Sequence, residues 1–498
     1  MSDSELTFLS ASQMAAQVRE KKISPVALVE THLARIEKLN PKINAFVHLS
    51  AEDALVKARE AEASVMRGDS LGPLHGVPIS IKSSIDVSGM RCEVGTKLRA
   101  GYVAQTDAPL VSRLRRAGAI ILGVTNTPEL LMAWETDNLL YGRTNNPWDL
   151  ACTAGGSSGG EAAAIASGCS AGGVGSDGGG SIRVPAHFCG ICGLKPTPGR
   201  IPATGHFPQS VGPFTVLGVV GPMARTVKDL KLLFEIMQGP DIGDVSAAPV
   251  PVRWPDVKAM RVAPDAPSTG SGQALVRGRA DEGVRAYKNC RIGYFEDDGR
   301  TSVTAETRIA LRQAAEALRA AGFEVEPFRP EGLESARQLW WKFFGGTGSM
   351  LLSPMTSGHE AELSPILKEF NTWVAAENPL TAQSLLDAWI ERDLLRMQIF
   401  AQMEEFPVLL CPVASIPAFR HGERSWQVEG KIVEYLDAWS YCEWFNLLGM
   451  PAAVVPIGRT PEGLPIGVQI VARPWEDELV LSVAAELERG PSRSPTLD

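Results

Sequence analysis

Two glycine-rich segments that lie close together in the sequence limit most tightly how this chain can fold. They read GGSSGG at residues 155–160 and SDGGGS at residues 176–181. Glycine gathers where the backbone turns sharply or where another group must approach it closely. The first segment carries Ser157 and Ser158, and the second ends in Ser181. A serine hydroxyl becomes a good nucleophile only beside a base, so the chemistry of these segments depends on a base elsewhere in the chain.

Length, composition and charge limit the class of protein. The chain has 498 residues, of which 44% are hydrophobic and 21% are charged, as in ordinary soluble globular proteins. Its net charge of -9 argues against a nucleic-acid partner, which would need a basic face. No apolar run has the length of a membrane-spanning helix, and the polar start MSDSELTFLSAS lacks a signal-peptide pattern. We therefore expect a cytoplasmic protein with no membrane span.

The cysteines do not form a recognisable framework. All eight are scattered along the chain, which favours reduced thiols over disulfides. Cys189 and Cys192 form one CxxC pair, but no second pair and no nearby histidine completes a zinc ligand set. We therefore expect no bound metal, and a metal or redox role for this pair is the minor alternative.

Short apolar strands alternate with helices along most of the chain. The run GVPISIKSSID from Gly76 is rich in β-branched residues and reads as a buried strand. Further strands are expected at 44–49, 119–124, 171–175, 217–223, 290–295, 323–328, 407–411, 452–457 and 466–472. Helices are expected at 25–39, 51–66, 107–117, 226–237 and 303–321, and through most of 333–405. This alternation predicts an α/β fold with a large mixed, mostly parallel β-sheet sandwiched between helices.

One segment, residues 239–289, interrupts the alternation. It is rich in Pro, Ala, Gly, Asp and Ser and contains STGSGQ, so we expect an irregular surface insertion. The regular pattern returns at 290–329, and residues 330–440 form a mainly helical region. Residues 441–498 hold the last strands, and the end of the chain after Gly490 is expected to be frayed.

Lys82 is the candidate base, because it is the single lysine in the apolar strand that begins at Gly76. A lysine in an apolar setting is costly unless it is paired or neutral. Desolvation lowers the pKa of the amine, so that a neutral amine can accept a proton. The strand pattern alone favours a second interpretation, in which Lys82 caps the strand end and reaches solvent. Both interpretations stay open on these residues.

Two other uses of the glycine-rich segments fit less well. GGSSGG could hold a phosphate on free backbone N–H groups. However, the lysine of a Walker motif does not follow its glycines, and the segment does not form a GxGxxG motif after a clear strand. GxSxG, the elbow of a Ser-His-Asp triad, occurs at residues 155–159, but there it opens a glycine loop. His75 and His187 are the nearest histidines in the sequence, and we expect both to be packed or hydrogen-bonded.

Taken in order, three segments resemble the amidase signature family of serine hydrolases: GVPISIKSSID, TAGGSSGGEAAAIASG and SDGGGSIRVPAHFCGICGLKPTPGRIP. Five further segments also match sequence patterns of that family: TNTPE, YGRTNNPW, VGPMARTVKDL, GMPAAVVPIG and GLPIGVQIVAR. The resemblance covers nearly the whole chain apart from 239–288 and 330–440. It implies the amidase signature fold, with residues 1–238, 290–329 and 441–498 in the catalytic core and 330–440 as the substrate-pocket region.

The resemblance implies a role for each residue of the motifs. Ser181 is the implied nucleophile, Ser157 the bridging serine and Lys82 the base, with a cis peptide bond between Gly156 and Ser157. The implied reaction is hydrolysis of an acylamide through an acyl-enzyme. The implied oxyanion donors are the backbone N–H groups of Gly178, Gly179, Gly180 and Ser181. The family needs no metal and no cofactor.

Two flanking residues and one neighbour are expected to support this triad. Asp177 and Arg183 flank the SDGGGS segment and are expected to pair and brace it, with ordinary loop solvation as the alternative. Ser158 is expected to hydrogen-bond near Lys82 or to the loop backbone.

Two positions depart from the family pattern. Gly178 stands where relatives often have threonine or isoleucine, which predicts a looser oxyanion loop. Cys92 stands where relatives often have threonine or serine, ten residues after the lysine. If that hydroxyl holds the lysine network in relatives, Cys92 does so here as a weaker hydrogen-bonding group, or another residue replaces it.

Substrate contacts are expected from two parts of the chain. Leu131, Met132 and Trp134 lie where relatives place acyl-pocket residues. A second group is aromatic and falls in the variable helical region: Trp340, Trp341, Phe343 and Phe344. Helical spacing lets only some of these side chains face a pocket. In the alternative interpretation, all four are core residues. An apolar pocket predicts a small apolar or aryl amide as substrate.

Two alternatives to this substrate class stay open. Carbamates (urethanes) and esters undergo the same acyl transfer. Cleavage of a urethane or an ester by the same catalytic residues is therefore the first alternative. The other rival is an amidotransferase subunit that hydrolyses glutamine for a partner, which would need charged pocket groups and a docking surface. For a small-molecule hydrolase we expect a monomer or a homodimer.

Overall fold

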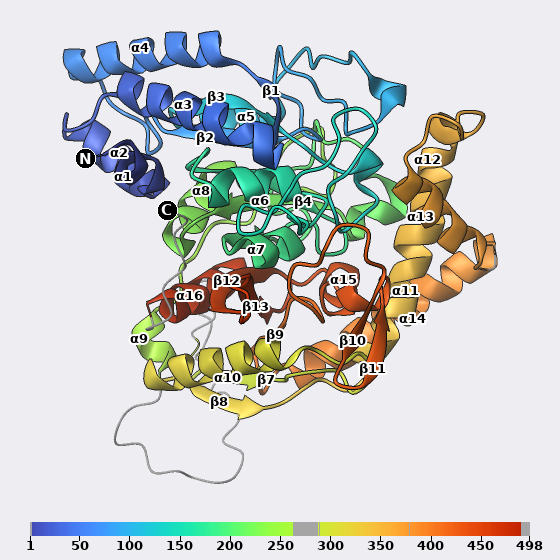
Figure 1. Cartoon of the computed structure of the whole chain (residues 1–498). Helices are drawn as coiled ribbons and strands as arrows, with labels where there is room; N and C mark the ends of the chain where they lie inside the picture. The colour runs from blue at the N-terminus through green and yellow to red at the C-terminus, as the bar shows by residue number, and fades with distance from the viewer. Residues whose placement is uncertain (1, 262–286, 288, 378, 490–498) are drawn as a thin grey trace.

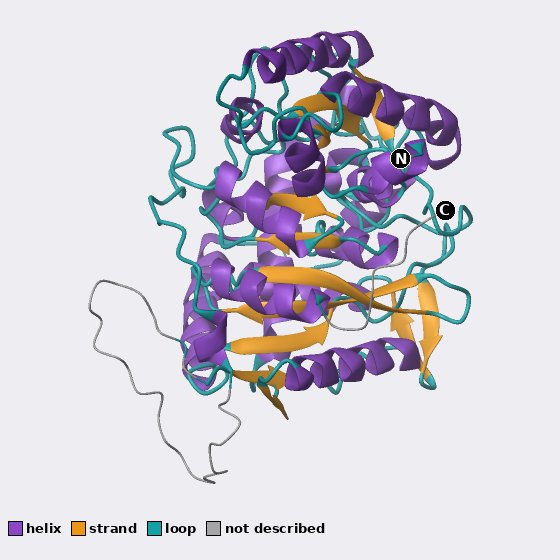
Figure 2. Cartoon of the chain, turned by 90° about the vertical axis from the view of Figure 1, so that its left-hand side faces the viewer, coloured by secondary structure: helices purple, strands orange, loops and turns teal. Residues whose placement is uncertain are grey.

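Eleven strands form one mixed sheet through the centre of the molecule (Figures 1 and 2). Across the sheet they are β1 (Phe46–Leu49), β3 (Ile120–Thr125), β2 (Pro78–Lys82), β4 (Gly172–Asp177), β6 (Val219–Ala224), β5 (Cys192–Lys195), β12 (Ala452–Arg459), β13 (Pro465–Ala472), β9 (Val408–Pro412), β7 (Arg291–Tyr294) and β8 (Glu324–Pro327). A separate hairpin joins β10 (Ser425–Val428) and β11 (Lys431–Glu434). The computed structural model describes residues 2–261, 287, 289–377 and 379–489.

Parallel pairing is confined to two blocks of this sheet. One block joins β3, β2 and β4, and the other joins β9, β7 and β8. The strands between the blocks pair antiparallel, as does β1 with β3. The predicted large mixed sheet is therefore confirmed, with its parallel part in the two blocks. The connection from β12 to β13 is too short for the crossover that a parallel pair would need.

Helices cover both faces of the sheet (Figure 1). The α-helices are α1 (Asp3–Phe8), α2 (Ala11–Arg19), α3 (Pro25–Ile43), α4 (Ala51–Arg67), α5 (Pro109–Arg116), α6 (Gly159–Ala166), α7 (Arg183–Cys189), α8 (Val227–Met237), α9 (Val257–Met260), α10 (Ala305–Ala320), α11 (Ala336–Trp341), α12 (Gly348–Thr356), α13 (Pro365–Ala375), α14 (Ala382–Gln402), α15 (Ser440–Leu447) and α16 (Asp477–Glu488). Short 3₁₀ turns are η1 (Lys97–Arg99), η2 (Glu129–Leu131), η3 (Gly212–Val216), η4 (Leu333–Ser335) and η6 (Asp437–Trp439), and η5 (Lys342–Thr347) is a π-helical turn.

The alternation of side chains along the strands divides the core into two apolar clusters. In β12, Ala452 and Val454 belong to the cluster that includes α6 and α7, whereas Ala453 and Val455 belong to the cluster that includes α8, α10 and α16. Successive residues of a strand point to opposite faces, so each cluster fills one face of the sheet. Within the described ranges, none of the helices combines the length and the apolar character that a membrane crossing requires.

The predicted elements agree with the observed ones apart from their ends. The helix expected at 25–39 continues to Ile43, and the helical region 333–405 is present. Residues 239–261 are irregular apart from α9, as expected for the insertion. The rest of that segment up to 286, and the end of the chain after Gly490, lie outside the described residues.

The pairing of β2 with β4 places the two chemical motifs together. These strands are parallel neighbours, with Ile81 opposite Val174. Lys82 is the last residue of β2 and Asp177 is the last residue of β4. Because parallel strands end at the same edge of a sheet, the lysine and the SDGGGS segment meet there. The strand that ends in Lys82 thus runs beside the strand that leads into SDGGGS.

Candidate active site

The amine of Lys82 is completely buried at the end of β2. Its Nζ lies 2.7 Å from Ser157 Oγ and 2.9 Å from Ser158 Oγ. It also lies 2.9 Å from Ser176 Oγ and 3.4 Å from the Ser176 carbonyl oxygen. All four of these partners are neutral oxygens. The alternative in which Lys82 reaches solvent is therefore wrong.

The charge state of this lysine follows from its burial. Burial lowers the pKa of Lys82 well below its usual range, because the ammonium form loses its hydration. Asp177 and Glu161 oppose this shift through their negative charges. Burial also raises the pKa of Glu161 to about 7, against the hydrogen bonds from Ser80 and Thr125. A lysine in this setting can hold a neutral amine, whose lone pair accepts a proton.

The GGSSGG loop presents two serines to the amine. The peptide bond between Gly156 and Ser157 is cis, as the resemblance implies. The Ser158 hydroxyl donates to the Ser176 carbonyl at 3.2 Å, which leaves its oxygen to accept from Lys82. The Ser158 backbone N–H donates to the carbonyl of Ser181 at 3.1 Å and so ties the two loops together. The expected position of Ser158 beside Lys82 is confirmed.

The second loop is braced by a buried ion pair. Arg183 Nη2 lies 3.0 Å from Asp177 Oδ1 and Arg183 Nε lies 3.1 Å from Oδ2, with both side chains fully buried. Burial alone would raise the pKa of Asp177, but the Arg183 guanidinium holds that pKa well below its usual range. The same carboxylate accepts the backbone N–H of Ile182 at 3.0 Å. The predicted pairing is confirmed, and it fixes the turn that carries Ser181.

This ion pair gives a stability prediction. Replacing Arg183 by glutamine leaves the Asp177 carboxylate buried without its counter-charge, so we expect the free energy of unfolding to fall by about 3–5 kcal/mol. The matched control is Arg143→Gln, because Arg143 and Asp137 form an ion pair that is well exposed to solvent, and such pairs contribute only about 0–1 kcal/mol. Urea unfolding followed by tryptophan fluorescence measures both variants. Equal losses in the two would contradict a bracing role for Arg183.

Two tryptophans hold the glycines between Asp177 and Ser181. Trp340 Nε1 donates to the carbonyl of Gly178 at 2.8 Å, and Trp134 Nε1 donates to the carbonyl of Gly179 at 2.8 Å. The N–H and C=O groups of a trans peptide point in opposite directions, so each bond also fixes the direction of the next N–H group. A Cβ on Gly179 would lie 2.4 Å from the Trp340 ring, which explains the glycine there.

One predicted oxyanion donor is corrected by these contacts. The backbone N–H of Gly180, a residue with φ of +114°, donates to Asp177 Oδ1 at 2.7 Å and is thus already used. Within the part of the chain that the structure describes, no hydrogen bond engages the N–H groups of Gly178, Gly179 and Ser181. Three of the four predicted donors are left for a ligand.

Gly178, which departs from the family pattern, does not leave an empty space. An added Cβ there would lie 3.1 Å from Cε2 of Phe344, so the ring of Phe344 occupies the volume that a larger residue would take. Phe344 in turn stacks on Trp340 with ring centroids 4.5 Å apart. The packing therefore argues against the looser loop that the glycine predicts.

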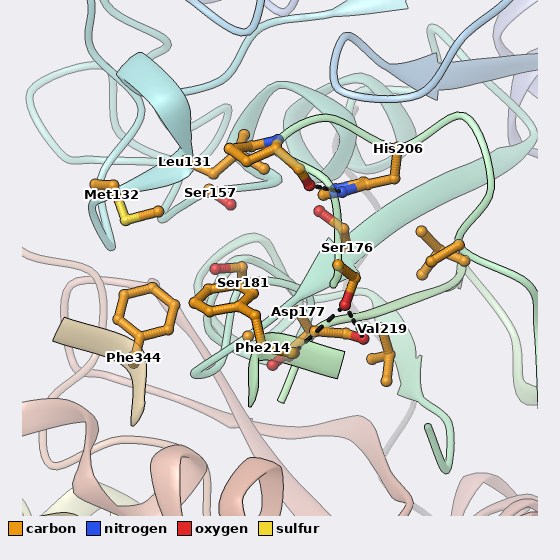
Figure 3. Close-up of a pocket in the computed structure, with 16 residues that line it drawn as sticks. Leu131, Met132, Ser157, Ser176, Asp177, Ser181, His206, Phe214, Val219 and Phe344 are labelled. Atoms are coloured by element: carbon orange, nitrogen blue, oxygen red, sulfur yellow. Dashed lines mark hydrogen bonds between the residues drawn. The ribbon is translucent and has the colours of Figure 1, made fainter. Parts of the chain in front are cut away.

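A cavity of about 480 Å³ lies over the two serines. Ser157 and Ser181 both line it (Figure 3). Met132 and Phe344 lie on one side of these serines and His206 on the other (Figure 3). A smaller cavity of about 230 Å³ adjoins Ser181 on the side of Trp134 and Phe344. The serines thus sit between a mainly apolar wall and a wall that carries an imidazole.

The predicted substrate contacts divide into two groups. Leu131, Met132 and Phe344 line both cavities, and Trp134 lines the smaller one. Trp340 and Trp341 are not among the described residues that line either cavity. Trp340 supports the glycine loop from behind, and Trp341 packs on Trp340 and Phe370. Phe343 is a fully buried core residue against Trp389.

Cys92 is not part of the lysine network. Its thiol interacts with Asp86 and Arg99, and burial raises its pKa to about 12. Ser176 is the residue that the sequence prediction missed: its hydroxyl lies beside Lys82 Nζ, where a hydroxyl partner was expected. Its position as the serine just before Asp177 was the one available signal.

The remaining candidates have structural partners. The Cys189 thiol donates to the Ala154 carbonyl, and the Cys192 thiol faces Arg225 and Glu488, so the pair does not share a ligand. His187 is fully buried and accepts the Gly467 N–H at 2.7 Å. His75 is hydrogen-bonded to the Ala61 carbonyl at 2.9 Å. The expectation that both histidines are packed or hydrogen-bonded is confirmed.

Comparison with known proteins places this site in a family. The model of the family described as Amidase matches residues 27–481. The chain belongs to the amidase family. The matched range contains both glycine-rich loops and Lys82, so the predicted resemblance is confirmed, and the protein is an amidase-family hydrolase.

Individual members of this family are similar over their whole length. An acylamidase from Rhodococcus erythropolis is 35% identical, over 98% of this chain and 96% of that protein. One of the subunits of the glutamyl-tRNA(Gln) amidotransferase from Streptomyces coelicolor is 34% identical, over 97% of this chain and 96% of that protein. Among solved structures, a bacterial aryl acylamidase of the amidase signature family has a TM-score of 0.83 at 26% identity, covering 99% of this chain and 98% of that one. The predicted amidase signature fold is confirmed.

Proposed function

We propose that this protein hydrolyses the C–N bond of a small amide with an apolar or aryl part, through Ser181, Ser157 and Lys82 and an acyl-enzyme. One observation carries the proposal: a fully buried lysine amine lies 2.7 Å from Ser157 Oγ, beside a cavity that Ser157 and Ser181 both line. Burial of the amine favours its neutral form, which is the form that a base needs.

The proton route uses both serines. Neutral Lys82 accepts the Ser157 proton while Ser157 Oγ accepts the Ser181 proton, and Ser181 Oγ bonds to the carbonyl carbon. When the C–N bond breaks, Ser157 gives its proton to the leaving nitrogen and Lys82 returns one to Ser157. Ser181 is then acylated and the amine is free. Water attacks the acyl-enzyme by the same relay, which releases the acid and restores the Ser181 hydroxyl.

Charge develops on the carbonyl oxygen during both attacks. The N–H groups of Gly178, Gly179 and Ser181 are the proposed donors to this oxyanion, and each such donor contributes about 3 kcal/mol to transition-state stabilisation. Trp134 and Trp340 support this role, because their bonds to the loop carbonyls hold the peptide planes before substrate arrives. A loop held in this way loses little energy to reorganisation during the reaction.

The walls of the cavity favour a substrate with an apolar part. Leu131, Met132 and Phe344 supply an apolar surface on one side of the serines, and Phe214 packs against Phe344 at 5.4 Å between ring centroids. Anilides, alkyl amides and aryl carbamates have an apolar group of this kind next to a carbonyl. Glutamine would bring a charged α-amino acid group instead, which these apolar residues do not match.

A hydrolysis screen of the purified chain tests the proposed substrate class. We expect Ser181-dependent turnover of acyl anilides and apolar amides, with kcat/KM at least about tenfold above that for glutamine, because desolvation of an apolar group is favourable and that of a charged one is costly. Product acid and amine are measured by chromatography. Hydrolysis of glutamine alone would favour the amidotransferase function, and hydrolysis of carbamates or esters alone would favour the urethanase variant. Light scattering of the same sample distinguishes a monomer from a homodimer, the two states that we expect.

A further inference from the structure

His206 is held firmly in the wall of the catalytic cavity by the segment that follows Lys82. It forms an antiparallel bridge with Ile85. On either side of it, Phe207 N–H donates to the Ser84 carbonyl and Asp86 N–H donates to the Gly205 carbonyl, each at 2.8 Å. Its imidazole lines the cavity across from Met132 and Phe344 (Figure 3). The catalytic lysine and this histidine are therefore set by the same short stretch of backbone.

The hydrogen bond of Nδ1 fixes which ring nitrogen carries the proton. His206 Nδ1 lies 2.9 Å from the carbonyl oxygen of Pro208. A carbonyl oxygen can only accept, so Nδ1 carries the hydrogen and donates it. In a neutral imidazole Nε2 is then unprotonated and offers a lone pair. Burial lowers the pKa of His206 to about 4, so that the neutral ring is the form present near neutral pH.

The acceptor on Nε2 is unused. In the described part of the chain this buried nitrogen has no hydrogen-bond partner. Buried polar atoms are nearly always paired, and leaving one unpaired is costly. An unpaired acceptor on a residue that lines a ligand cavity points to a ligand that brings a donor.

We infer that His206 is a specificity-determining residue, whose Nε2 accepts a hydrogen bond from an N–H group of the substrate beside the scissile carbonyl. This inference rests on the proposed amide hydrolysis and narrows its substrate class. Secondary amides, primary amides and N–H carbamates can make the bond. Esters and N-methylated amides cannot, because they have no hydrogen on the atom next to the carbonyl. The enzyme therefore selects N–H substrates among compounds with the same acyl group.

Three matched compounds test the inference: 4-nitroacetanilide, its N-methyl analogue and 4-nitrophenyl acetate. His206→Phe removes the acceptor and keeps an aromatic ring, whereas His206→Gln keeps an acceptor at the end of a side chain of similar length. Loss of one hydrogen bond in a site built to make it changes discrimination by about 10- to 100-fold. We expect the anilide-to-ester ratio of kcat/KM to fall by that factor in His206→Phe and to recover at least in part in His206→Gln.

The control is His359→Phe, since His359 is exposed on the turn after α12 and the ratio should stay at the wild-type value. Equal losses on the anilide and the ester in His206→Phe would overturn the inference and leave His206 a purely structural role. An unchanged ratio, or wild-type turnover of the N-methyl anilide as fast as that of the anilide, would overturn it as well. Failure of the proposed function looks different: the wild type would then hydrolyse no amide in a Ser181-dependent way.

Discussion

Replacing Ser181 by alanine should lower kcat/KM for an amide substrate by roughly 10⁴- to 10⁶-fold, the range seen when the nucleophile of a serine hydrolase is removed. The loss is so large because no acyl-enzyme can form, and neither the oxyanion donors nor Lys82 can replace the missing oxygen. Stability should change little, since the change removes one atom at the edge of a cavity. Steady-state kinetics on the best amide found by the screen, together with thermal unfolding, measures both effects.

Ser357→Ala is the matched control for this variant. Ser357 is exposed at the end of α12, so its loss should leave kcat/KM and thermal stability unchanged. Residual activity of Ser181→Ala above about one hundredth of wild type would mean that another residue attacks the carbonyl. Ser157 would be the first candidate, because it lines the same cavity.

Replacing Lys82 by methionine should lower kcat/KM by about 10²- to 10⁴-fold, the usual contribution of a general base. Methionine keeps an unbranched side chain in the buried space but has no lone pair of comparable basicity. Lys82→Arg should lose as much, because a guanidinium stays protonated and cannot accept the Ser157 proton. A variant of either kind with wild-type kcat/KM would contradict the base assignment.

The pH dependence of kcat/KM gives a second test of the lysine. Only the neutral amine accepts a proton, so activity should rise as pH rises through the pKa of Lys82. Burial lowers this pKa well below the ordinary value of 10.5, so the rise should lie well below that pH. Lys82→Met should lack this rise. An increase that begins only near pH 10 in the wild type would contradict the buried neutral amine.

A second buried lysine provides the control for this profile. Burial lowers the pKa of Lys195 to about 7, but its Nζ donates to the Pro196 carbonyl at 3.0 Å. Among the residues that the structure describes, no serine is hydrogen-bonded to this amine. Lys195→Met should therefore keep the rise of kcat/KM with pH that the wild type shows. If Lys195→Met instead removed the rise, the titrating base would be Lys195.

The residues of the proposed triad could be singled out from the sequence because they lie in short motifs that follow one another in a recognisable order. Lys82 stands alone in an apolar strand, and Ser157 and Ser181 stand in glycine loops. The strands around them follow from apolar runs, and the pairing of β2 with β4 follows from the parallel topology. Only burial could decide between the two interpretations of Lys82, since a strand pattern does not tell whether its last residue reaches water.

Residues that act through contacts distant in sequence could not be placed in this way. Trp340 looked like a pocket residue, but its indole reaches back to a glycine carbonyl on another segment. Gly180 resembled its neighbours in the oxyanion loop, and only the fold shows that its N–H belongs to Asp177. His206 carries no motif at all, and what brings it to the cavity is the bridge between its loop and Ile85.

Labelling with a fluorophosphonate, followed by peptide mass spectrometry, tests the Ser181–Ser157–Lys82 assignment most directly. In the reaction a bond forms between Ser181 Oγ and phosphorus, fluoride leaves, and the Ser181 proton passes through Ser157 to Lys82. We predict one adduct, on the peptide that contains Ser181, in the wild type. We predict no adduct in Ser181→Ala and labelling slowed by about 10²- to 10⁴-fold in Lys82→Met. An adduct that persists in Ser181→Ala, or that forms as fast without Lys82, would contradict the assignment.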